Sequence, residues 1–535
     1  MIPKTFSIFF LAVSTLMQAG APQHLVFTYM GDPSTSLTAN WQWIGEERGD
    51  EALVQYDIVS RADNPDAYAS EAMGTVFAIP GLKDRVMARV QLHNLKPDTT
   101  YYLRVGQAGK EFSKEVKVRT IPADDQPLCF VTGGDMGTSQ DVRTLLKHAA
   151  SYNPQFSAVG GDIAYANGKL DSVGDWDTWL TYYTEEMVTA DGYTIPLLLA
   201  VGNHEVRGGF EKTTSEAPFF FGFFGQDPDQ SFFKRTFGSN LVLFALDSGH
   251  TTSHDSQVDW LNRELTASKD IRYKAAIYHV PLYPSHRDFM GYYSRLGRQH
   301  WESVFDAHGL TVAFENHDHT FKRSHFMKGG KKVAEGEGTL YLGDGCWGRS
   351  ARTISLETPW YLEKQGAIKH FWVVDVAPDH MTYRAVDIEN RVFDIYPGSE
   401  AEIESASKIL ASIPSTYKIP DDILLSDLDL RQTENWKGGK LETKISNPFD
   451  HPVEIWFQAY SHQNLLTAKG LPDFPLKLAP GEDRVLSIEW SPKEGDAVLV
   501  ENVGLSFNVQ AKVHDPKLEE PVLFAGKISV KILKP

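Results

Sequence analysis

Five short polar motifs, each at the end of an apolar, strand-like run, constrain this chain more than any other feature. They contain side chains that can bind metal ions through oxygen or nitrogen. In layered α/β sheets, functional groups collect at the carboxyl ends of the strands, so we expect these motifs to converge in space. The candidate ligands are Asp135, Asp162, Tyr165, Asn203, His279, His317 and His319.

This mixture of carboxylate, phenolate, amide and imidazole donors suits a pair of neighbouring cations. Hard, highly charged ions favour oxygen ligands, and imidazole can complete their coordination shell. Two such ions can share a carboxylate and a hydroxide, and can bind the oxygens of one phosphoryl group together. Asp162 is the candidate bridging carboxylate. One motif alone would be a weak signal, but the ordered set of five indicates cleavage of phosphate esters.

The 535 residues exceed the usual size of one domain, and changes of pattern divide the chain into three. Residues 22–121 contain alternating apolar runs between turn residues, which indicates an all-β sandwich. Residues 122–400 alternate strand-like and helix-like segments, which is typical of a layered α/β domain with a largely parallel sheet. Residues 401–535 begin with a polar linker around Pro414 and Pro420. Strand-like runs follow it and predict a second β-sandwich, of open role.

Residues 1–21 are expected to lie outside the fold. Lys4 precedes the apolar run from Ile8 to Met17, and Ala19-Gly20-Ala21 resembles a cleavage site. This pattern is typical of a secretory signal peptide, with an N-terminal anchor helix as the alternative. No later stretch is long and apolar enough for a stable membrane span. We therefore expect an exported protein, either secreted or periplasmic.

Charge and cysteine content narrow the possible partners. The net charge of -18 argues against a nucleic-acid surface, because binding phosphate backbones relies on Lys and Arg. A small phosphate ester would have to be attracted by local metal charge.

Cys129 and Cys346 allow at most one disulfide, and we expect Cys129 to be a buried free thiol. The oligomeric state is left open by the sequence.

The order G-D-x-G, G-D-x-x-Y, G-N-H-E, a single His and H-x-H resembles the calcineurin-like metallophosphoesterases. The tyrosine of the second motif makes the chain similar to the purple acid phosphatases. The run Leu95 to Val105 resembles the L-x-P-x-T-x-Y-x-x-x-V signature of fibronectin type III domains, and the large purple acid phosphatases carry a similar N-terminal module. The resemblance covers residues 22 to about 395 and does not reach the C-terminal sandwich.

The resemblance implies a binuclear centre that holds Fe3+ and a divalent ion, which is Zn2+, Fe2+ or Mn2+. Asp162 would bridge the two ions. The ferric ligands would be Asp135, Tyr165 and His319, and the divalent ligands would be Asn203, His279 and His317.

The resemblance also implies two roles outside the metal ligands. His204 would face the phosphate group. His286 would protonate the leaving alkoxide, and the alternative for His286 is a solvent-facing loop histidine.

Three local features are less typical of that family. Asn316 replaces the usual glycine before H-x-H, and Asn tolerates the left-handed backbone that such a glycine often marks. The loop Gly343–Gly348 matches G-x-G-x-x-G, but no helix pattern follows it, so we expect a loop at the rim of the site. The aromatic run Pro218–Phe224 is expected to pack in the core, with a wall for an apolar leaving group as the alternative.

Three functions compete. The first is an exported acid phosphatase that hydrolyses phosphate monoesters through a metal-bound hydroxide. The second is a phosphodiesterase that uses the same two-metal site. The third is a non-catalytic exported protein that keeps the metals for structure or for phosphate capture. The presence of all seven candidate ligands counts against the third.

Overall fold

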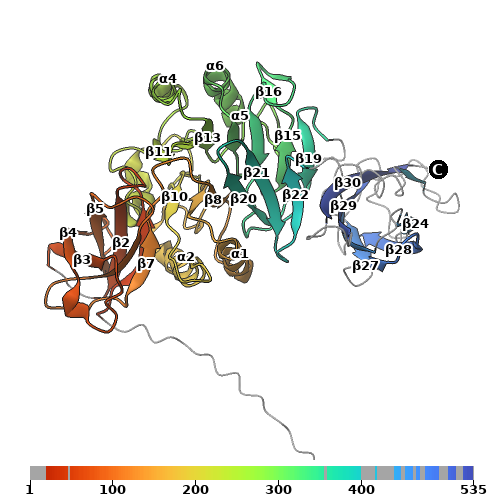
Figure 1. Cartoon of the computed structure of the whole chain (residues 1–535). Coiled ribbons are helices and arrows are strands. Elements are labelled where there is room, and N and C mark those ends of the chain that lie inside the picture. Colours follow the sequence, from red (N-terminus) through yellow and green to blue (C-terminus); the bar gives the residue numbers. More distant parts are fainter. Residues whose placement is uncertain are drawn as a thin grey trace, which may run out of the picture.

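The computed structural model describes residues 20–45, 49–354, 358–398, 416–418, 439–447, 452–461, 466–469, 476–492, 504–513 and 522–533. Residues 1–19, which form most of the predicted signal peptide, lie outside this set. The linker around Pro414 and Pro420 also lies outside it. Within them, no helix combines the length and the apolar character needed to cross a bilayer. An N-terminal β domain, a central layered α/β domain and a C-terminal β-rich region follow one another along the chain (Figure 1). The predicted multidomain fold class is confirmed.

The N-terminal domain is a sandwich whose two layers are joined by one strand. The strand β4 pairs along Ser70–Thr75 with β3 and along Thr75–Phe77 with β5, so it passes from one layer to the other. Two indole rings, Trp41 and Trp43, fill the interior with centroids 5.6 Å apart. The strands are β1 (Gln23–Thr28), β2 (Leu37–Ile44), β3 (Glu51–Asp57), β4 (Ser70–Phe77), β5 (Arg85–Leu92), β6 (Thr100–Gly106) and β7 (Val116–Arg119).

The first sheet of the central domain has the order β10-β9-β8-β20-β21-β22. β8, β9 and β10 are parallel, whereas β20, β21 and β22 are added in antiparallel pairs. The bounds are β8 (Leu128–Gly133), β9 (Phe156–Val159), β10 (Leu197–Leu199), β20 (His370–Val376), β21 (Met381–Asp387) and β22 (Val392–Tyr396).

The second sheet has the order β11-β12-β13-β14-β18-β15-β19. Its four central strands are parallel, and the strands at both edges are antiparallel. The bounds are β11 (Phe233–Phe237), β12 (Leu241–Ala245), β13 (Tyr273–Ile277), β14 (Val312–Phe314), β15 (Phe321–Ser324), β18 (Leu340–Gly343) and β19 (Leu362–Gly366). A short hairpin of β16 (Met327–Lys328) and β17 (Lys331–Lys332) separates β15 from β18.

The expectation of a largely parallel sheet was therefore wrong, because both sheets are mixed. A parallel pair needs a long crossover, usually a helix, whereas an antiparallel pair can be joined by a short turn. Among the described residues, no α-helix follows α6 (Ser303–His308). The chain after residue 314 therefore adds most of its strands in antiparallel pairs.

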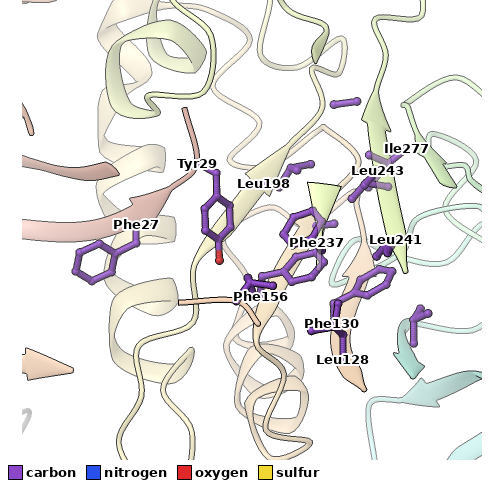
Figure 2. Packing of buried hydrophobic residues seen from close by; sticks show 14 of the residues in the cluster. Phe27, Tyr29, Leu128, Phe130, Phe156, Leu198, Phe237, Leu241, Leu243 and Ile277 are labelled. Atoms are coloured by element: carbon purple, nitrogen blue, oxygen red, sulfur yellow. The ribbon is translucent and has the colours of Figure 1, made fainter. Parts of the chain in front are cut away.

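The two sheets face each other across an aromatic core (Figure 2). Phe156 of β9 stacks on Phe130 at 4.9 Å and on Phe237 of the second sheet at 3.9 Å. Tyr29 of the N-terminal domain meets Phe237 edge to face at 5.7 Å. One continuous hydrophobic cluster thus joins the N-terminal domain to both sheets of the central domain.

Helices cover the outer faces of both sheets (Figure 1). α1 (Gln140–Ala150) and α2 (Val173–Glu186) belong to the hydrophobic cluster on the outer face of the first sheet. α4 (Val258–Ala267) and α6 belong to the corresponding cluster on the second sheet. The helical segment that ends with α6 is irregular: α5 (Tyr292–Gly297) and one π-helical turn, Arg298–Glu302, lead into α6.

The aromatic run forms α3 (Pro218–Phe223) and packs in the core, as expected. Phe219, Phe223 and Phe224 surround Trp176 of α2 with ring centroids 5.6 to 6.1 Å away. Arg89 of the N-terminal domain donates to the Phe221 carbonyl oxygen at 3.0 Å. The buried rings are therefore placed to anchor the N-terminal domain, and they form no wall for a leaving group.

Both cysteines are free thiols. Cys129 in β8 is the free thiol that we expected, but it is half-buried rather than buried, whereas Cys346 is fully buried. Burial, followed by the neighbouring Asp375 carboxylate, raises the pKa of Cys129 to about 12. The Cys129 thiol is therefore unreactive at neutral pH.

The described C-terminal strands form two antiparallel-rich sheets, with orders β23-β30-β29-β25-β27 and β24-β28-β26. The first contains β23 (Thr416–Lys418), β25 (Val453–Ser461), β27 (Leu476–Leu478), β29 (Gly504–Val513) and β30 (Val522–Leu533). The second contains β24 (Gly439–Ser446), β26 (Leu466–Lys469) and β28 (Asp483–Pro492).

Candidate metal centre

The five motifs follow the ends of five parallel strands drawn from both sheets. The first three motifs follow β8, β9 and β10 of the first sheet, and the last two follow β13 and β14 of the second. Side chains from both sheets therefore meet at one edge of the sandwich, as expected for strand ends in α/β folds.

Several candidate ligands have left-handed backbone angles, which are rare for residues other than glycine. Such angles turn the chain sharply where each strand ends, and each costs on the order of 1–3 kcal/mol, which the surrounding packing has to offset. These residues are Asp135 (φ 56°), Asp162 (φ 54°), Tyr165 (φ 61°), His317 (φ 76°) and His319 (φ 54°).

The turn before H-x-H differs from the one that Asn316 suggested. His317 takes the left-handed angle, and Asn316 does not. The Asn316 amide nitrogen instead donates to the Tyr278 carbonyl oxygen at 3.0 Å, and its backbone N–H donates to the His279 carbonyl oxygen at 3.0 Å. Gly160 leaves room for this amide, because a Cβ at residue 160 would lie 1.8 Å from the Asn316 nitrogen. Asn316 therefore joins the ends of β13 and β14.

One group of candidate ligands contains Asp135, Tyr165 and His319. The His319 Nε2 lies 2.9 Å from Asp135 Oδ1, and the Tyr165 hydroxyl lies 3.1 Å from His319 Nε2. The same hydroxyl lies 3.3 Å from Asp135 Oδ1. Asp135, His319 and Asp162 each offer one donor atom within 4.8 Å of the others.

The second group contains Asn203, His279 and His317. The His279 Nε2 lies 3.1 Å from Asn203 Oδ1 and 2.9 Å from His317 Nδ1. It also lies 3.1 Å from Asp162 Oδ2. Asp162, His279 and His317 again have donor atoms within 4.8 Å of one another. The two groups share Asp162, so the donor set fits two neighbouring cations with Asp162 between them.

Backbone contacts orient these ligands. His279 Nδ1 lies 2.9 Å from the Gly160 carbonyl oxygen, which leaves Nε2 facing the other ligands. Although burial acts against it, the His279 imidazole holds the pKa of Asp162 well below its usual range. The His204 backbone N–H donates to Asp162 Oδ1 at 2.7 Å. Asp162 is thus an ionised carboxylate fixed from two sides.

Glu205, the last residue of G-N-H-E, was not assigned a role from the sequence. Its buried carboxylate accepts backbone N–H groups of Asp162 at 2.7 Å, Ile163 at 2.8 Å and Gly202 at 2.8 Å. Burial, together with the Asp162 charge, raises the pKa of Glu205 to about 7. Glu205 ties the second motif to the third, and the acidic residue of the motif was the signal that could have indicated it.

Asp318, between the two histidines of H-x-H, was also missed. Its Oδ2 accepts the backbone N–H groups of Ser285 at 2.9 Å and His286 at 2.8 Å. Its Oδ1 pairs with Arg287 Nη1 at 2.7 Å. The carboxylate therefore fixes the loop that follows His279 against the H-x-H turn.

The two candidate catalytic histidines are placed differently. The His204 ring lies 4.1 Å from the Tyr165 ring, and its Nε2 is 3.7 Å from Asp162 Oδ2. Burial lowers the pKa of His204, and the Asp162 charge partly opposes this. His286 is exposed, and its Nδ1 lies 2.7 Å from the Thr353 carbonyl oxygen. The structure brings His204 to the centre and leaves the His286 ring on the surrounding loop.

The loop Gly343–Gly348 lies against the first motif. The Trp347 backbone N–H donates to the Gly134 carbonyl oxygen at 2.8 Å, and the Arg349 N–H donates to the Asp135 carbonyl oxygen at 3.1 Å. This loop therefore borders the candidate centre.

Known families match two parts of the chain. Residues 22–120 match the N-terminal domain of purple acid phosphatases, and residues 131–321 match the calcineurin-like phosphoesterases. Purple acid phosphatase 18 from Arabidopsis thaliana is 23% identical over 61% of this chain and 72% of its own length. Purple acid phosphatase 15 from the same plant is 24% identical over 49% of this chain, and the match spans about half (53%) of its own length.

Solved structures show the same fold. A purple acid phosphatase from yellow lupin (Lupinus luteus) seeds superposes with a TM-score of 0.60 at 15% identity, covering 70% of this chain and 74% of the lupin chain. PhoD superposes with a TM-score of 0.54 at 13% identity, covering 71% of this chain and 89% of its own. These two superpositions show the fold. The two family matches, in this order, and the related sequences show that the chain belongs to the purple acid phosphatase family, with that family's N-terminal domain in front of a calcineurin-like phosphoesterase domain.

Proposed function

We propose that this protein hydrolyses phosphate monoesters at a binuclear metal centre between the ends of the two central sheets. One observation carries the proposal: two groups of donor atoms, each within 4.8 Å, share the single carboxylate Asp162. Family membership supports phosphatase chemistry, and the monoester preference is our inference.

The ligand assignment follows the chemistry of the donors. Phenolate and carboxylate oxygens suit a hard ferric ion, and imidazole with an amide oxygen suits a divalent ion such as Zn2+, Fe2+ or Mn2+. When bound, such a pair supplies Lewis acidity toward water and toward the phosphoryl oxygens. The ferric ion would be held by Asp135, Tyr165 and His319, the divalent ion by Asn203, His279 and His317, and both ions by Asp162.

The remaining residues position the substrate and the ligands. His204 lies beside Asp162 with its side chain 32% exposed, so it can donate a hydrogen bond to a phosphoryl oxygen bound at the centre. Glu205 fixes the backbone that presents Asp162, through the N–H groups of Asp162 and Ile163. We assign His286 as the candidate proton donor to a leaving alkoxide, which requires its ring to leave the Thr353 carbonyl oxygen.

The experiment compares turnover of 4-nitrophenyl phosphate with turnover of bis(4-nitrophenyl) phosphate, together with elemental analysis of the purified full chain. We expect two metal ions per chain, at least one of them iron, and faster hydrolysis of the monoester. Faster hydrolysis of the diester would favour a phosphodiesterase. Bound metal without any turnover would favour a non-catalytic role.

We also propose that the protein is exported, to the periplasm or outside the cell, and that its domains span residues 22–121, 122–400 and 401–535. The charged, apolar and small-residue segments of residues 1–21 support export. N-terminal sequencing of the mature protein should begin near residue 22. A mature chain that begins at Met1 would contradict this.

A further inference from the structure

A fully buried ion cluster lies next to the H-x-H turn. Lys322 of β15 pairs with Glu315, which follows β14, and with Asp344, which follows β18. Lys322 Nζ lies 2.7 Å from Asp344 Oδ1, and none of the three side chains is exposed to solvent. We call these three residues the buried triad. Because its side chains reach no solvent, the triad can act on the metal centre only through the residues that it contacts.

The presence of charge at this depth calls for an explanation. Removing an ammonium and two carboxylates from water is costly, and well-packed apolar side chains of similar volume would often stabilise a fold as well or better. Although burial acts against it, the Asp344 and Glu315 carboxylates raise the pKa of Lys322, so the ammonium stays charged at neutral pH. The role of the triad therefore lies in the particular groups that its polar atoms bind.

These groups belong to the loop that carries His279. Residues 278–291 lie between β13 and α5 and belong to no helix or strand, so their backbone groups need partners elsewhere. Each member of the triad binds one residue of this loop. The bonds join Glu315 Oε1 to the Leu282 N–H at 2.6 Å, Lys322 Nζ to the Tyr283 carbonyl oxygen at 2.5 Å, and Asp344 Oδ2 to the Ser285 N–H at 3.1 Å.

Glu315 holds the chain on both sides of His279. Its Oε1 accepts the hydroxyl of Tyr278, the residue before His279, at 2.7 Å. The same oxygen accepts the N–H of Leu282, three residues after His279. Lys322 pairs with Oε2 of this carboxylate and so orients it. One carboxylate, fixed by one ammonium, therefore determines where the chain around His279 lies.

We propose that Lys322 is a positioning residue that acts through Glu315 to place His279, and thereby sets the affinity of the divalent-ion site. This rests on the proposed function, which assigns His279 to the divalent ion. Two of the proposed ferric ligands, Asp135 and Tyr165, follow strands of the first sheet, whereas the triad belongs to the second. Loss of the triad should therefore weaken the divalent-ion site more than the ferric site.

Two double variants test this with equal disturbance of one strand. Removing Lys322 alone would leave the buried Glu315 carboxylate without its cation and would destabilise the whole fold. Lys322→Met/Glu315→Gln instead removes one charge of each sign at similar volume. The matched control is Arg323→Met/Asp394→Asn, which removes a buried pair at 2.8 Å whose side chains are 4% and 1% exposed. Arg323 is the next residue of β15, so it points to the opposite face of the sheet.

Hydrogen exchange tests the positioning directly, on the full chain as purified. Mass spectrometry would follow peptides that cover residues 278–287. We expect exchange in Lys322→Met/Glu315→Gln to be about tenfold faster or more, because the loop opens more often when its buried partners are lost. The control should exchange at the wild-type rate in these peptides. Unchanged exchange in the first variant, or the same acceleration in both, would overturn the proposal.

A metal-binding experiment tests the consequence for the centre. A chelator would compete for Zn2+ with the iron-loaded full chain, and the visible spectrum would report on the ferric ion. We expect Lys322→Met/Glu315→Gln to lower the Zn2+ affinity by about tenfold or more and to keep the visible band. The control should change neither. Wild-type Zn2+ affinity in the first variant, or equal loss of both ions, would overturn the proposal.

The two experiments also separate this proposal from the proposed function. If wild type bound no divalent ion beside the iron, the binuclear centre of the proposed function would be wrong. Hydrogen exchange would then decide alone whether Lys322 and Glu315 hold the loop in place, because that measurement needs neither a second ion nor turnover. If wild type bound both ions but the first variant behaved like the control, the centre would stand and the positioning role would be rejected.

Discussion

Gly345 and Asp135 are so close that no other residue fits at position 345: a Cβ there would lie 1.9 Å from Asp135 Oδ2. Gly345 also has φ +84°, which disfavours every side chain. The same Asp135 oxygen accepts the His317 backbone N–H at 2.7 Å. The loop at the rim therefore determines where one candidate ligand can stand.

We expect Gly345→Ala to push Asp135 away and to remove one metal ion per chain, with turnover falling more than about tenfold. Elemental analysis and 4-nitrophenyl phosphate hydrolysis would measure this. Gly336→Ala is the matched control, because Gly336 has φ +77° with no atom within 4 Å of the added Cβ. If both variants kept two metal ions and full activity, Asp135 would not be a ligand.

Loss of Asp162 should weaken metal binding more than loss of any other single ligand, because both donor groups contain Asp162. We expect Asp162→Asn to lower the affinity for both ions and to reduce turnover by more than about 100-fold. Circular dichroism should show a folded protein, since the side-chain volume hardly changes. Asp375→Asn, on the half-exposed side of β20, serves as the control. A variant that retained both ions would exclude the bridging role.

We expect Tyr165→Phe to remove the visible absorption band of the iron-loaded protein. A phenolate bound to ferric iron absorbs visible light, and phenylalanine keeps the ring while removing only the oxygen. The contacts of this ring with His204 and Arg349 would persist. We expect the iron-loaded wild type to be purple and the variant to lose that band, with weaker binding of the ferric ion. The same visible spectrum in both proteins would exclude Tyr165 as a ligand.

Acid should weaken the contact between the N-terminal and central domains. The His24 ring bonds to the Thr181 hydroxyl at 3.0 Å and to the Gln42 amide at 2.6 Å. Burial lowers the pKa of His24 to about 4, with Asp177 raising it and Arg85 lowering it further. The unfolded chain takes up this proton near pH 6.5, so stability is lost as the pH falls from 6.5 toward 4.

At pH 5 this loss amounts to about 1–2 kcal/mol. We expect the Tm of wild type to fall between pH 7 and pH 5, and that of His24→Gln to fall less, because glutamine does not titrate. His380→Gln is the control, since that histidine is 60% exposed. Equal falls in wild type and His24→Gln would assign the acid sensitivity to other groups.

The sequence predicted the parallel half of the central domain better than the antiparallel half. β8, β9 and β13 are largely apolar, and each is followed by a motif. The strands β15 and β19 carry buried Lys322, Arg323 and Gln365, so they lack the apolar pattern on which such predictions depend. Their charges are satisfied by partners distant in sequence, such as Asp394 for Arg323 at 2.8 Å.

The residues of the candidate site were also only partly predictable from the sequence. Ligands could be named because each motif pairs a donor with a strand end. Glu205 and Asp318 were missed because they accept backbone N–H groups of other segments: the motifs show that an acidic residue is present, but not which N–H groups it binds. The contact of the His286 ring with Thr353 also depends on a loop far along the chain. The metal ligands were therefore more predictable than the residues that orient them.

The boundary near residue 121 separates two domains in the sequence, but their side chains pack against each other in one continuous core. Asp177 on α2 pairs with Arg85 Nη2 of the N-terminal sandwich at 3.0 Å, and Tyr29 enters the same cluster as Phe237. A protease that cut the connecting segment would leave two pieces still held together. A central domain expressed from residue 122 onward would expose an apolar face that Tyr29 normally covers, and we expect it to aggregate. Exchange of this sandwich between homologous enzymes would therefore require exchange of its contact surface on α2 and α3 as well.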